Sequence, residues 1–266
     1  MKGMNMTTLP EFNTLLYKKE TRILTITLNR PENLNSFNAD MLAELSEAVE
    51  IASKDKDVRT VVFTAAGRVF SCGGDLRNMV NNQKTVEADS IKQGIKYVQG
   101  VFNRIEALQQ PTIAAINGHA VGAGFQLSLA CDFRIASSHA KLGVNDLKIG
   151  ILPALGATTR LPALIGLAKA KELILLGELI TPAQALEIGL INRVVEREDL
   201  DAAVNEMIEK LLTSAPLALA AAKDLLDSGS SLDEAAVMQS FLVKSADATE
   251  GITAFFEKRR PCFKGH

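Results

Sequence analysis

Two short corners that contain glycine are the positions in this sequence best suited to chemistry. They are Ser71-Cys72-Gly73-Gly74-Asp75 and Asn117-Gly118-His119-Ala120-Val121-Gly122-Ala123-Gly124. Each follows a predicted buried strand and precedes a predicted helix, and their small side chains allow backbone N–H groups to approach a ligand closely. Two such amides that converge on one oxygen would form an oxyanion hole. This arrangement would suit a thioester carbonyl that becomes an enolate.

Other motifs for phosphate, nucleophilic or metal chemistry are incomplete or absent in the sequence. Gly122-Ala123-Gly124 begins like a dinucleotide fingerprint, but Leu127 stands where its last glycine belongs. The sequence contains no GxxxxGK[ST] loop and no GxSxG elbow. The histidines show no metal-ligand spacing; they are His119, His139 and His266. We therefore expect no metal site.

The elements that must position these corners alternate between strands and helices. Apolar patterns predict strands over 21–28, 58–64, 112–116 and 132–136, and helices over 39–53, 85–108 and 125–130. The small-residue stretch 118–124 is predicted as a loop. Strand, helix and strand recur along the first 195 residues, which predicts α/β layering.

The pattern changes after residue 195. Amphipathic helices are predicted over 200–212, 216–226, 232–243 and 249–258, without a convincing strand between them. We place a boundary near residues 195–199. It divides the chain into an α/β core, residues 1–195, and a helical C-terminal region, residues 196–266.

Composition excludes several classes of protein. The 266 residues include 29 Lys plus Arg and 31 Asp plus Glu, a net charge of −2, which argues against a nucleic-acid partner. No stretch offers the ~20 apolar residues of a membrane helix. The three cysteines form neither a disulfide framework nor a CxxC pair, and this usage predicts a reducing cytoplasm; they are Cys72, Cys131 and Cys262.

Several blocks of sequence, in order along almost the whole chain, resemble the crotonase (enoyl-CoA hydratase/isomerase) superfamily. The matching stretches include 28–36, 70–76, 114–132, 142–161, 185–195 and 255–259. The resemblance implies a spiral of ββα turns with a C-terminal helical region that forms a homotrimer, and trimers that can pair as a hexamer. It also implies an acyl-CoA thioester substrate. No separate cofactor is expected, because coenzyme A is part of that substrate.

The resemblance assigns four residues to the reaction. The amides of Gly74 and Ala123 would form the oxyanion hole, through backbone atoms alone. Hydratases of the family hold a water between two glutamates, and the corresponding positions here are Gln126 and Asp146. A glutamine has no proton to exchange near neutral pH. An aspartate is one methylene shorter than a glutamate, which withdraws its carboxylate by ~1.5 Å.

Three functions remain open at this point. A single carboxylate, Asp146, can move one proton between C2 and C4 of an enoyl thioester, so an isomerase or related one-base reaction is the first hypothesis. A hydratase in which Gln126 positions water is the second, and decarboxylation or hydrolysis of an acyl-CoA also stays open. The third is an acyl-CoA-binding protein without catalysis.

Coenzyme A carries phosphates, so a local basic cluster is expected. Arg30, Arg68 and Arg77 near the first corner are candidates, together with the basic tail Lys258-Arg259-Arg260. The resemblance also suggests Phe263 and Lys264, contributed by a neighbouring subunit. The loop over 78–92 is expected to border the acyl pocket.

Overall fold

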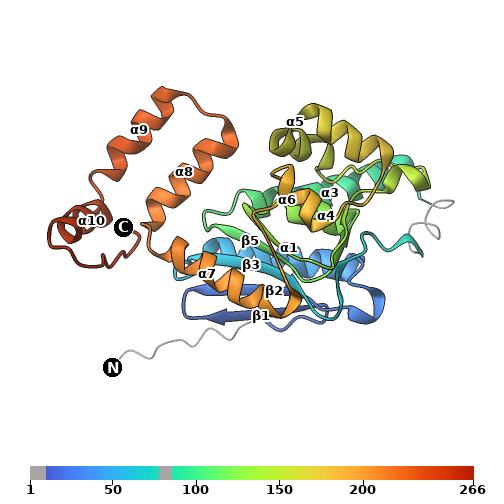
Figure 1. Cartoon of the computed structure of the whole chain (residues 1–266), viewed down its shortest axis with the longest axis horizontal. Helices are drawn as coiled ribbons and strands as arrows, with labels where there is room; N and C mark the ends of the chain where they lie inside the picture. Colours follow the sequence, from blue (N-terminus) through green and yellow to red (C-terminus); the bar gives the residue numbers. More distant parts are fainter. Residues whose placement is uncertain (1–9, 78–85) are drawn as a thin grey trace.

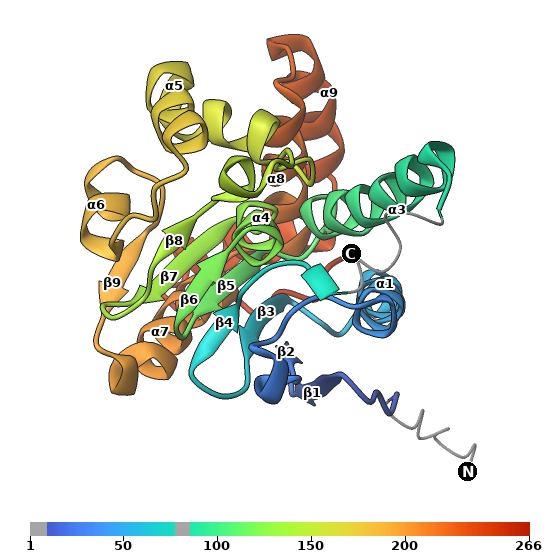
Figure 2. The same cartoon turned by 90° about the vertical axis from the view of Figure 1, so that its right-hand side faces the viewer.

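The computed structural model describes residues 10–77 and 86–266, and a mainly parallel six-stranded sheet runs through its centre (Figure 2). The strand order is β1-β2-β3-β5-β7-β9, and only the β1–β2 pair is antiparallel. The bounds are Leu15–Glu20, Ile23–Leu28, Thr60–Ala65, Thr112–Ile116, Phe133–Ser137 and Arg193–Val195. The central strands are buried on both faces, as expected for parallel strands covered by helices.

A second, shorter sheet lies beside the first and carries the candidate corners. It contains β4 (Val69–Ser71), β6 (His119–Val121) and β8 (Leu142–Gly143), all parallel. Successive turns of the chain add one strand to each sheet, first β3 and β4, then β5 and β6, then β7 and β8. This winding confirms the predicted α/β spiral.

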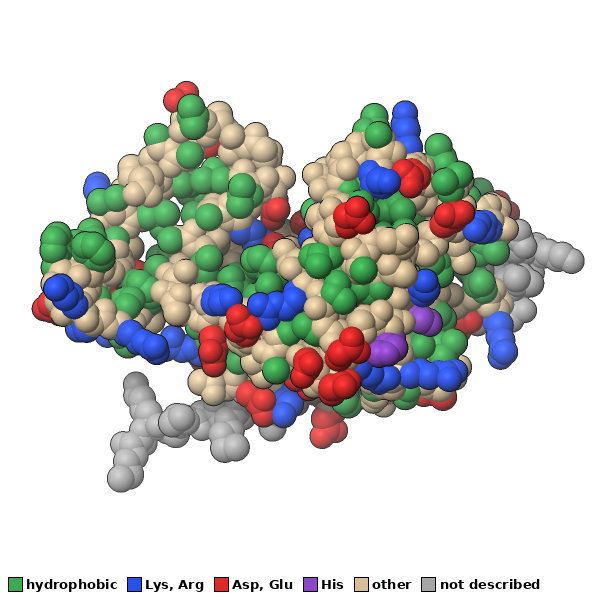
Figure 3. Space-filling view, in the orientation of Figure 1, with side chains coloured by type: hydrophobic (Ala, Val, Ile, Leu, Met, Phe, Trp, Pro, Cys, Tyr) green, Lys and Arg blue, Asp and Glu red, His purple; other side chains and the backbone are tan. Residues whose placement is uncertain are grey.

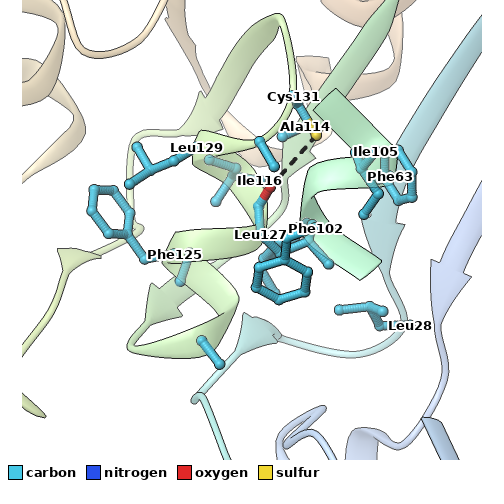
Figure 4. Packing of buried hydrophobic residues seen from close by; sticks show 14 of the residues in the cluster. Leu28, Phe63, Phe102, Ile105, Ala114, Ile116, Phe125, Leu127, Leu129 and Cys131 are labelled. Atoms are coloured by element: carbon cyan, nitrogen blue, oxygen red, sulfur yellow. Dashed lines mark hydrogen bonds between the residues drawn. The ribbon is translucent and has the colours of Figure 1, made fainter. Parts of the chain in front are cut away.

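Helices on one side of the sheets close the main hydrophobic core. They are α1 (Ala39–Lys54), α3 (Ala88–Glu106), α4 (Ala123–Leu129), α5 (Ala157–Leu176) and α6 (Pro182–Glu187). Every residue of α4 is buried, and Figure 4 shows Leu127 beside Phe102 of α3. Cys131 also packs in this core and is only 4% exposed, as expected for a small apolar residue.

The helix α7 (Leu200–Leu212) covers the opposite face of the large sheet. Its side chains Leu200, Val204 and Ile208 form a second core with Val62 and Ile135 of the sheet. This helix lies in the region predicted for oligomerisation, yet it completes the layering of the α/β core. The region after residue 195 therefore has a structural role within one chain.

The last three helices extend away from the sheets as an arm (Figure 1). They are α8 (Pro216–Ser228), α9 (Leu232–Leu242) and α10 (Ala246–Phe256). Large apolar side chains on the arm are exposed, and Figure 3 shows them gathered on one side of the molecule. The most exposed are Leu226 at 82%, Leu232 at 90%, Phe255 at 79% and Phe256 at 77%.

The structure corrects three details of the sequence prediction. The strand predicted from residue 21 begins at Ile23, because Thr21 has a positive φ of 55° and forms the turn after the unpredicted strand β1. The second corner contains the strand β6, where a loop was predicted. Short 3-10 turns occupy Pro31–Asn33, Asp146–Ile149 and Arg197–Asp199. The other predicted elements are present, with ends that differ by a few residues.

Candidate active site

The first corner leaves β4 and runs beside Phe37 as a one-residue parallel bridge. The Phe37 N–H donates to the carbonyl oxygen of Gly73 at 2.8 Å, and the Asp75 N–H donates to the carbonyl oxygen of Phe37 at 3.0 Å. Gly73 has a φ of +104°, which favours glycine. In a trans peptide the N–H points opposite to the C=O, so the Gly74 N–H points away from Phe37.

The second corner runs from β6 directly into α4. Gly122 has a φ of +55° and precedes Ala123, the first residue of the helix. The first N–H groups of a helix lack intrahelical acceptors, so the amide of Ala123 is available to a ligand. The Gly122 N–H donates to the carbonyl oxygen of Gly143 at 3.0 Å, which ties this corner to β8.

The two corners meet, although they lie about fifty residues apart in the sequence. A Cβ built on Gly73 would lie 3.4 Å from the backbone nitrogen of Ala123 and 3.2 Å from the carbonyl oxygen of Val121. Among the described residues, neither Gly74 nor Ala123 donates its backbone N–H to another part of the protein. The predicted pair of free amides therefore lies at one place in the fold.

Asp146 lies beside these corners, at the start of the 3-10 turn that follows β8. A Cβ built on Gly122 would lie 3.7 Å from its Oδ2 and 3.9 Å from its Oδ1. Oδ2 is buried and has no hydrogen-bond partner among the described residues. Burial disfavours the charged carboxylate and raises the pKa of Asp146 above its usual range. A carboxyl group with these properties next to two free amides can exchange protons with a bound ligand.

Gln126 lies on the first turn of α4 and is only 1% exposed. Its Oε1 accepts hydrogen bonds from the backbone N–H groups of Leu155 at 2.8 Å and Ala157 at 3.2 Å. The side-chain oxygen is thus used to hold the segment that leads into α5. Only the NH₂ group, which is a donor, is left for a ligand or a water molecule.

The residues predicted to bind coenzyme A differ in their contacts and exposure. Arg30 donates to the carbonyl oxygen of Ser36 at 2.6 Å and to Oδ1 of Asn33 at 3.1 Å, so it braces its own loop. Arg68 and Arg77 are exposed. The first part of the predicted acyl-pocket loop, residues 78–85, lies outside the described residues.

The C-terminal tail folds back on its own α10, on the other side of the molecule from α4 (Figure 1). The Lys264 N–H donates to the buried carboxylate of Asp247 at 2.7 Å, and the ring of Phe263 lies beside Gly251. Arg259 forms ion pairs with Glu250 and Glu257. Within one chain, Phe263 and Lys264 are therefore separate from Asp146. Their contact with coenzyme A bound to a neighbouring subunit stays a prediction.

A large cavity of about 720 Å³ lies away from the two corners, between the end of α3 and the helices α8 and α9. Figure 3 shows the hollow between the arm and the core.

In residues 10–77 and 86–266, no group of three or more His, Cys, Asp or Glu side chains is arranged for a metal ion. None of the described helices is both long enough and apolar enough to span a membrane.

Comparison with known proteins decides the family. The model of the enoyl-CoA hydratase/isomerase family matches residues 18–266. The chain belongs to this family. The short-chain-enoyl-CoA hydratase of Clostridium acetobutylicum is 37% identical over 257 residues, which cover 94% of this chain and 97% of that one. The crotonyl-CoA hydratase of Syntrophomonas wolfei is 34% identical, with 95% and 98% covered.

A solved structure supports the same assignment. The crystal structure of an enoyl-CoA hydratase from Bacillus anthracis is 34% identical in sequence and matches with a TM-score of 0.88. The match covers 96% of this chain and 100% of that one. The predicted crotonase superfamily and its fold are thereby confirmed. The protein is an enzyme of a family that acts on acyl-CoA thioesters.

Sequence reasoning missed the residues that support the first corner. Ser71 and Asn35 are wholly buried, and the Ser71 Oγ accepts from the Gly73 N–H and donates to the carbonyl oxygen of Asn35. One signal was present, since a serine two residues before a glycine commonly bonds to nearby backbone groups. No comparable signal linked Gln126 to Leu155 and Ala157, which follow about thirty residues later.

Proposed function

We propose that the protein stabilises the enolate of an acyl-CoA thioester between the backbone amides of Gly74 and Ala123. The convergence of the two corners and the free N–H groups support this proposal. Donors aimed at an oxygen that gains negative charge stabilise the transition state more than the ground state. Because both donors belong to the backbone, their position depends on the fold of the corners.

Asp146 is proposed as the single acid and base, and the reaction as an isomerisation or related one-base chemistry. With a 3-enoyl thioester, its carboxylate takes a proton from C2, and negative charge moves onto the thioester oxygen. The carboxylic acid then returns a proton at C4 as the double bond moves to C2–C3, so atoms and charge balance. Because the Asp146 proton can exchange with solvent between the two steps, deuterium enters the product in heavy water. No water and no second carboxylate take part.

The observation that carries this proposal is the use of Gln126 Oε1 by two backbone amides. A two-carboxylate hydratase needs a titratable group at both positions, because one group takes a proton from water while the other gives a proton to carbon. The free NH₂ group of Gln126 donates hydrogen bonds, but it does not gain or lose a proton near neutral pH. The site therefore offers one carboxylate, Asp146, and one amide donor.

Incubation of the protein with butenoyl-CoA isomers in heavy water tests this proposal. We expect interconversion of the 2-enoyl and 3-enoyl thioesters, seen by mass spectrometry and absorbance, with deuterium uptake and without addition of water. Asp146→Asn should lower this rate by about 10²-fold or more. Unchanged exchange in Asp146→Asn would remove Asp146 from the role of base. Binding without any reaction would favour the non-catalytic acyl-CoA-binding protein.

Hydration is the second candidate, favoured by the names of the relatives, which include hydratases at 37% and 34% identity. In that case the Gln126 amide would donate to a water that Asp146 activates. Addition of water to the 2-enoyl thioester by the unchanged protein would establish this alternative. If isomerisation is correct, Gln126→Glu should create hydration activity, because one carboxylate oxygen can keep the bonds to Leu155 and Ala157 while the other accepts from water.

The substrate and the assembly complete the proposal. We infer that exposed Arg68 and Arg77 contact the coenzyme A phosphates, while Arg30 supports the loop. Leu147, Ile149 and Leu152, all exposed after Asp146, offer apolar surface for the acyl group. The exposed apolar side chains of the arm support a homotrimer or a dimer of trimers, in which Phe263 and Lys264 of one subunit would approach the next.

A cytoplasmic location stays a prediction, with which the three free cysteines agree.

A further inference from the structure

A short segment of backbone, residues 34–37, runs alongside the first corner and holds it at four points. The Cys72 N–H donates to the carbonyl oxygen of Leu34 at 3.1 Å, and Ser71 Oγ donates to that of Asn35 at 2.8 Å. The remaining two bonds are those of the Phe37 bridge. We call residues 34–37 the support segment. Its position determines where the Gly73 carbonyl, and hence the Gly74 N–H, points.

The support segment has an unusual backbone. Leu34 and Asn35 both have a φ of 52°, in the left-handed region that non-glycine residues rarely adopt. For Leu34 this conformation is unfavourable, because its Cβ approaches the neighbouring carbonyl oxygen. Backbone outliers of this kind persist only where their surroundings determine them, and they concentrate at functional sites. Here the outlier lies directly against the corner that carries Gly74.

The side chain of Asn35 keeps the support segment in this conformation. Asn35 is 0% exposed, and its Nδ2 donates to the carbonyl oxygens of Ala66 at 2.9 Å and Val69 at 2.8 Å. Its Oδ1 accepts from the Arg30 N–H at 2.8 Å. Both N–H groups of the amide are therefore bonded to the backbone, at Ala66 before β4 and at Val69 within it, and an aspartate of the same shape would lack both donors.

Ser71 connects the support segment to the corner itself. Its Oγ donates to the Asn35 carbonyl and accepts from the Gly73 N–H at 3.2 Å. It also packs closely against α4, since a Cβ built on Gly124 would lie 2.4 Å from the Ser71 Cβ. One buried hydroxyl thus contacts the support segment, the first corner and the helix that carries the second corner.

We propose that Ser71 and Asn35 are positioning residues for the Gly74 amide. They fix the peptide plane between Gly73 and Gly74, so that its N–H and the N–H of Ala123 can converge on one oxygen. Neither side chain touches the substrate. The inference rests on the proposed enolate chemistry, because it assigns a purpose to the direction of the Gly74 N–H.

The test is the infrared spectrum of [1-¹³C]butyryl-CoA bound to the protein, because hydrogen bonds lower the stretching frequency of the thioester carbonyl. The unchanged protein should show a lower frequency than free butyryl-CoA. Ser71→Ala should lose most of this displacement, and Ser71→Cys, with a weaker donor and acceptor, should be intermediate. Exchange of the C2 protons should fall by about 10-fold to 100-fold in Ser71→Ala, with the dissociation constant of butyryl-CoA changed less than about threefold.

Ser137→Ala is the matched control, because Ser137 is equally buried and its hydroxyl has no partner among the described residues. It should keep the full displacement. Asn35→Asp, if it folds, should resemble Ser71→Ala; if it does not, the series at Ser71 decides. A full displacement and normal exchange in folded Ser71→Ala would overturn the assignment. No displacement in the unchanged protein would instead contradict the proposed oxyanion hole.

Discussion

At the scale of single residues, the burial of Asp146 affects both its pKa and the stability of the folded protein. Its Oδ2 is buried without a partner, and burial raises the pKa of this carboxyl group above its usual value of 3.8. In the proposed reaction, the raised pKa brings the acid closer to the pH at which it takes and returns a proton. The same burial makes the charged form unfavourable in the folded protein.

We predict that Asp146→Asn stabilises the protein at neutral pH while it removes proton exchange. The folded protein holds the Asp146 proton more tightly than the unfolded chain does. The stability of the unchanged protein therefore falls as pH rises from the unfolded to the folded pKa, and the penalty is complete above the folded pKa. Urea unfolding at neutral pH should show a higher free energy of unfolding for Asp146→Asn. The difference should shrink toward pH 4.

Asp57→Asn is the control for that comparison, because the Asp57 side chain is 86% exposed. It should change the free energy of unfolding by less than about 0.5 kcal/mol. A lower stability of Asp146→Asn at neutral pH would mean that the carboxylate gains more from its surroundings than burial costs.

The main residues of the candidate site could be proposed from the sequence, but their surroundings could not. Gly74, Ala123, Gln126 and Asp146 follow from motif positions, and the structure brings their elements together. The bonds from Leu155 and Ala157 to Gln126 form only when α5 starts beside α4. Whether the side-chain oxygen of Gln126 is free therefore depends on tertiary structure. No local pattern contains that information.

At the scale of elements, segments with a clear apolar period were predictable, whereas short or charged strands and the helix α5, which lacks such a period, were not. The spacing of apolar residues predicted α1, α3 and the helices after residue 195. In β1, Lys18, Lys19 and Glu20 interrupt the apolar pattern, because the strand lies at the edge of the sheet. The strand β6 has three residues, too few for any periodicity. It becomes a strand because it pairs with β4 and β8 in the folded protein.

A partly buried ion pair joins the arm to the core. Lys223 of α8 donates to Oδ2 of Asp132 at 2.8 Å, and this oxygen also accepts from the backbone N–H and the hydroxyl of Thr112. The Lys223 and Asp132 side chains are only 10% and 19% exposed. A charged hydrogen bond in such surroundings contributes more than a surface pair does.

We predict that Lys223→Met lowers the free energy of unfolding by about 2 kcal/mol, because Asp132 keeps its charge and loses its cation. Protection of the α8 amides in hydrogen exchange should fall as well. The exposed pair of Lys54 and Glu50 is the control, and Lys54→Met should cost less than about 0.5 kcal/mol. Equal effects of the two variants would show that the ion pair does not hold the arm.

At the scale of the whole molecule, the arm exposes more apolar surface than one chain can cover. Phe255 and Phe256 lie together on α10 with their ring centroids 5.7 Å apart, and both are mostly exposed. The cavity between the arm and the core is lined in part by Leu217, Met238 and Phe241. Apolar surface on this scale marks an interface.

We predict that the protein sediments as a trimer or a multiple of it, and that Phe255→Glu shifts it toward single chains of 28.6 kDa. A charge on this surface would be buried without a partner on assembly. Leu16→Glu is the control, since Leu16 is 50% exposed on β1, away from the arm, and should leave the sedimentation coefficient unchanged. A monomeric unchanged protein would contradict this assembly.

The parallel bridge between Phe37 and Gly74 holds the backbone of the first corner without help from the side chain of Asp146. In the proposed reaction, polarising the thioester depends on main-chain direction, whereas moving the proton depends on the side chain of Asp146. A change of acid or base can therefore alter the product without rebuilding the place where the carbonyl sits. In protein design, residues 34–37 and 71–75 could be kept unchanged as one structural unit. New reactions could then be sought by exchanging only the groups that face it.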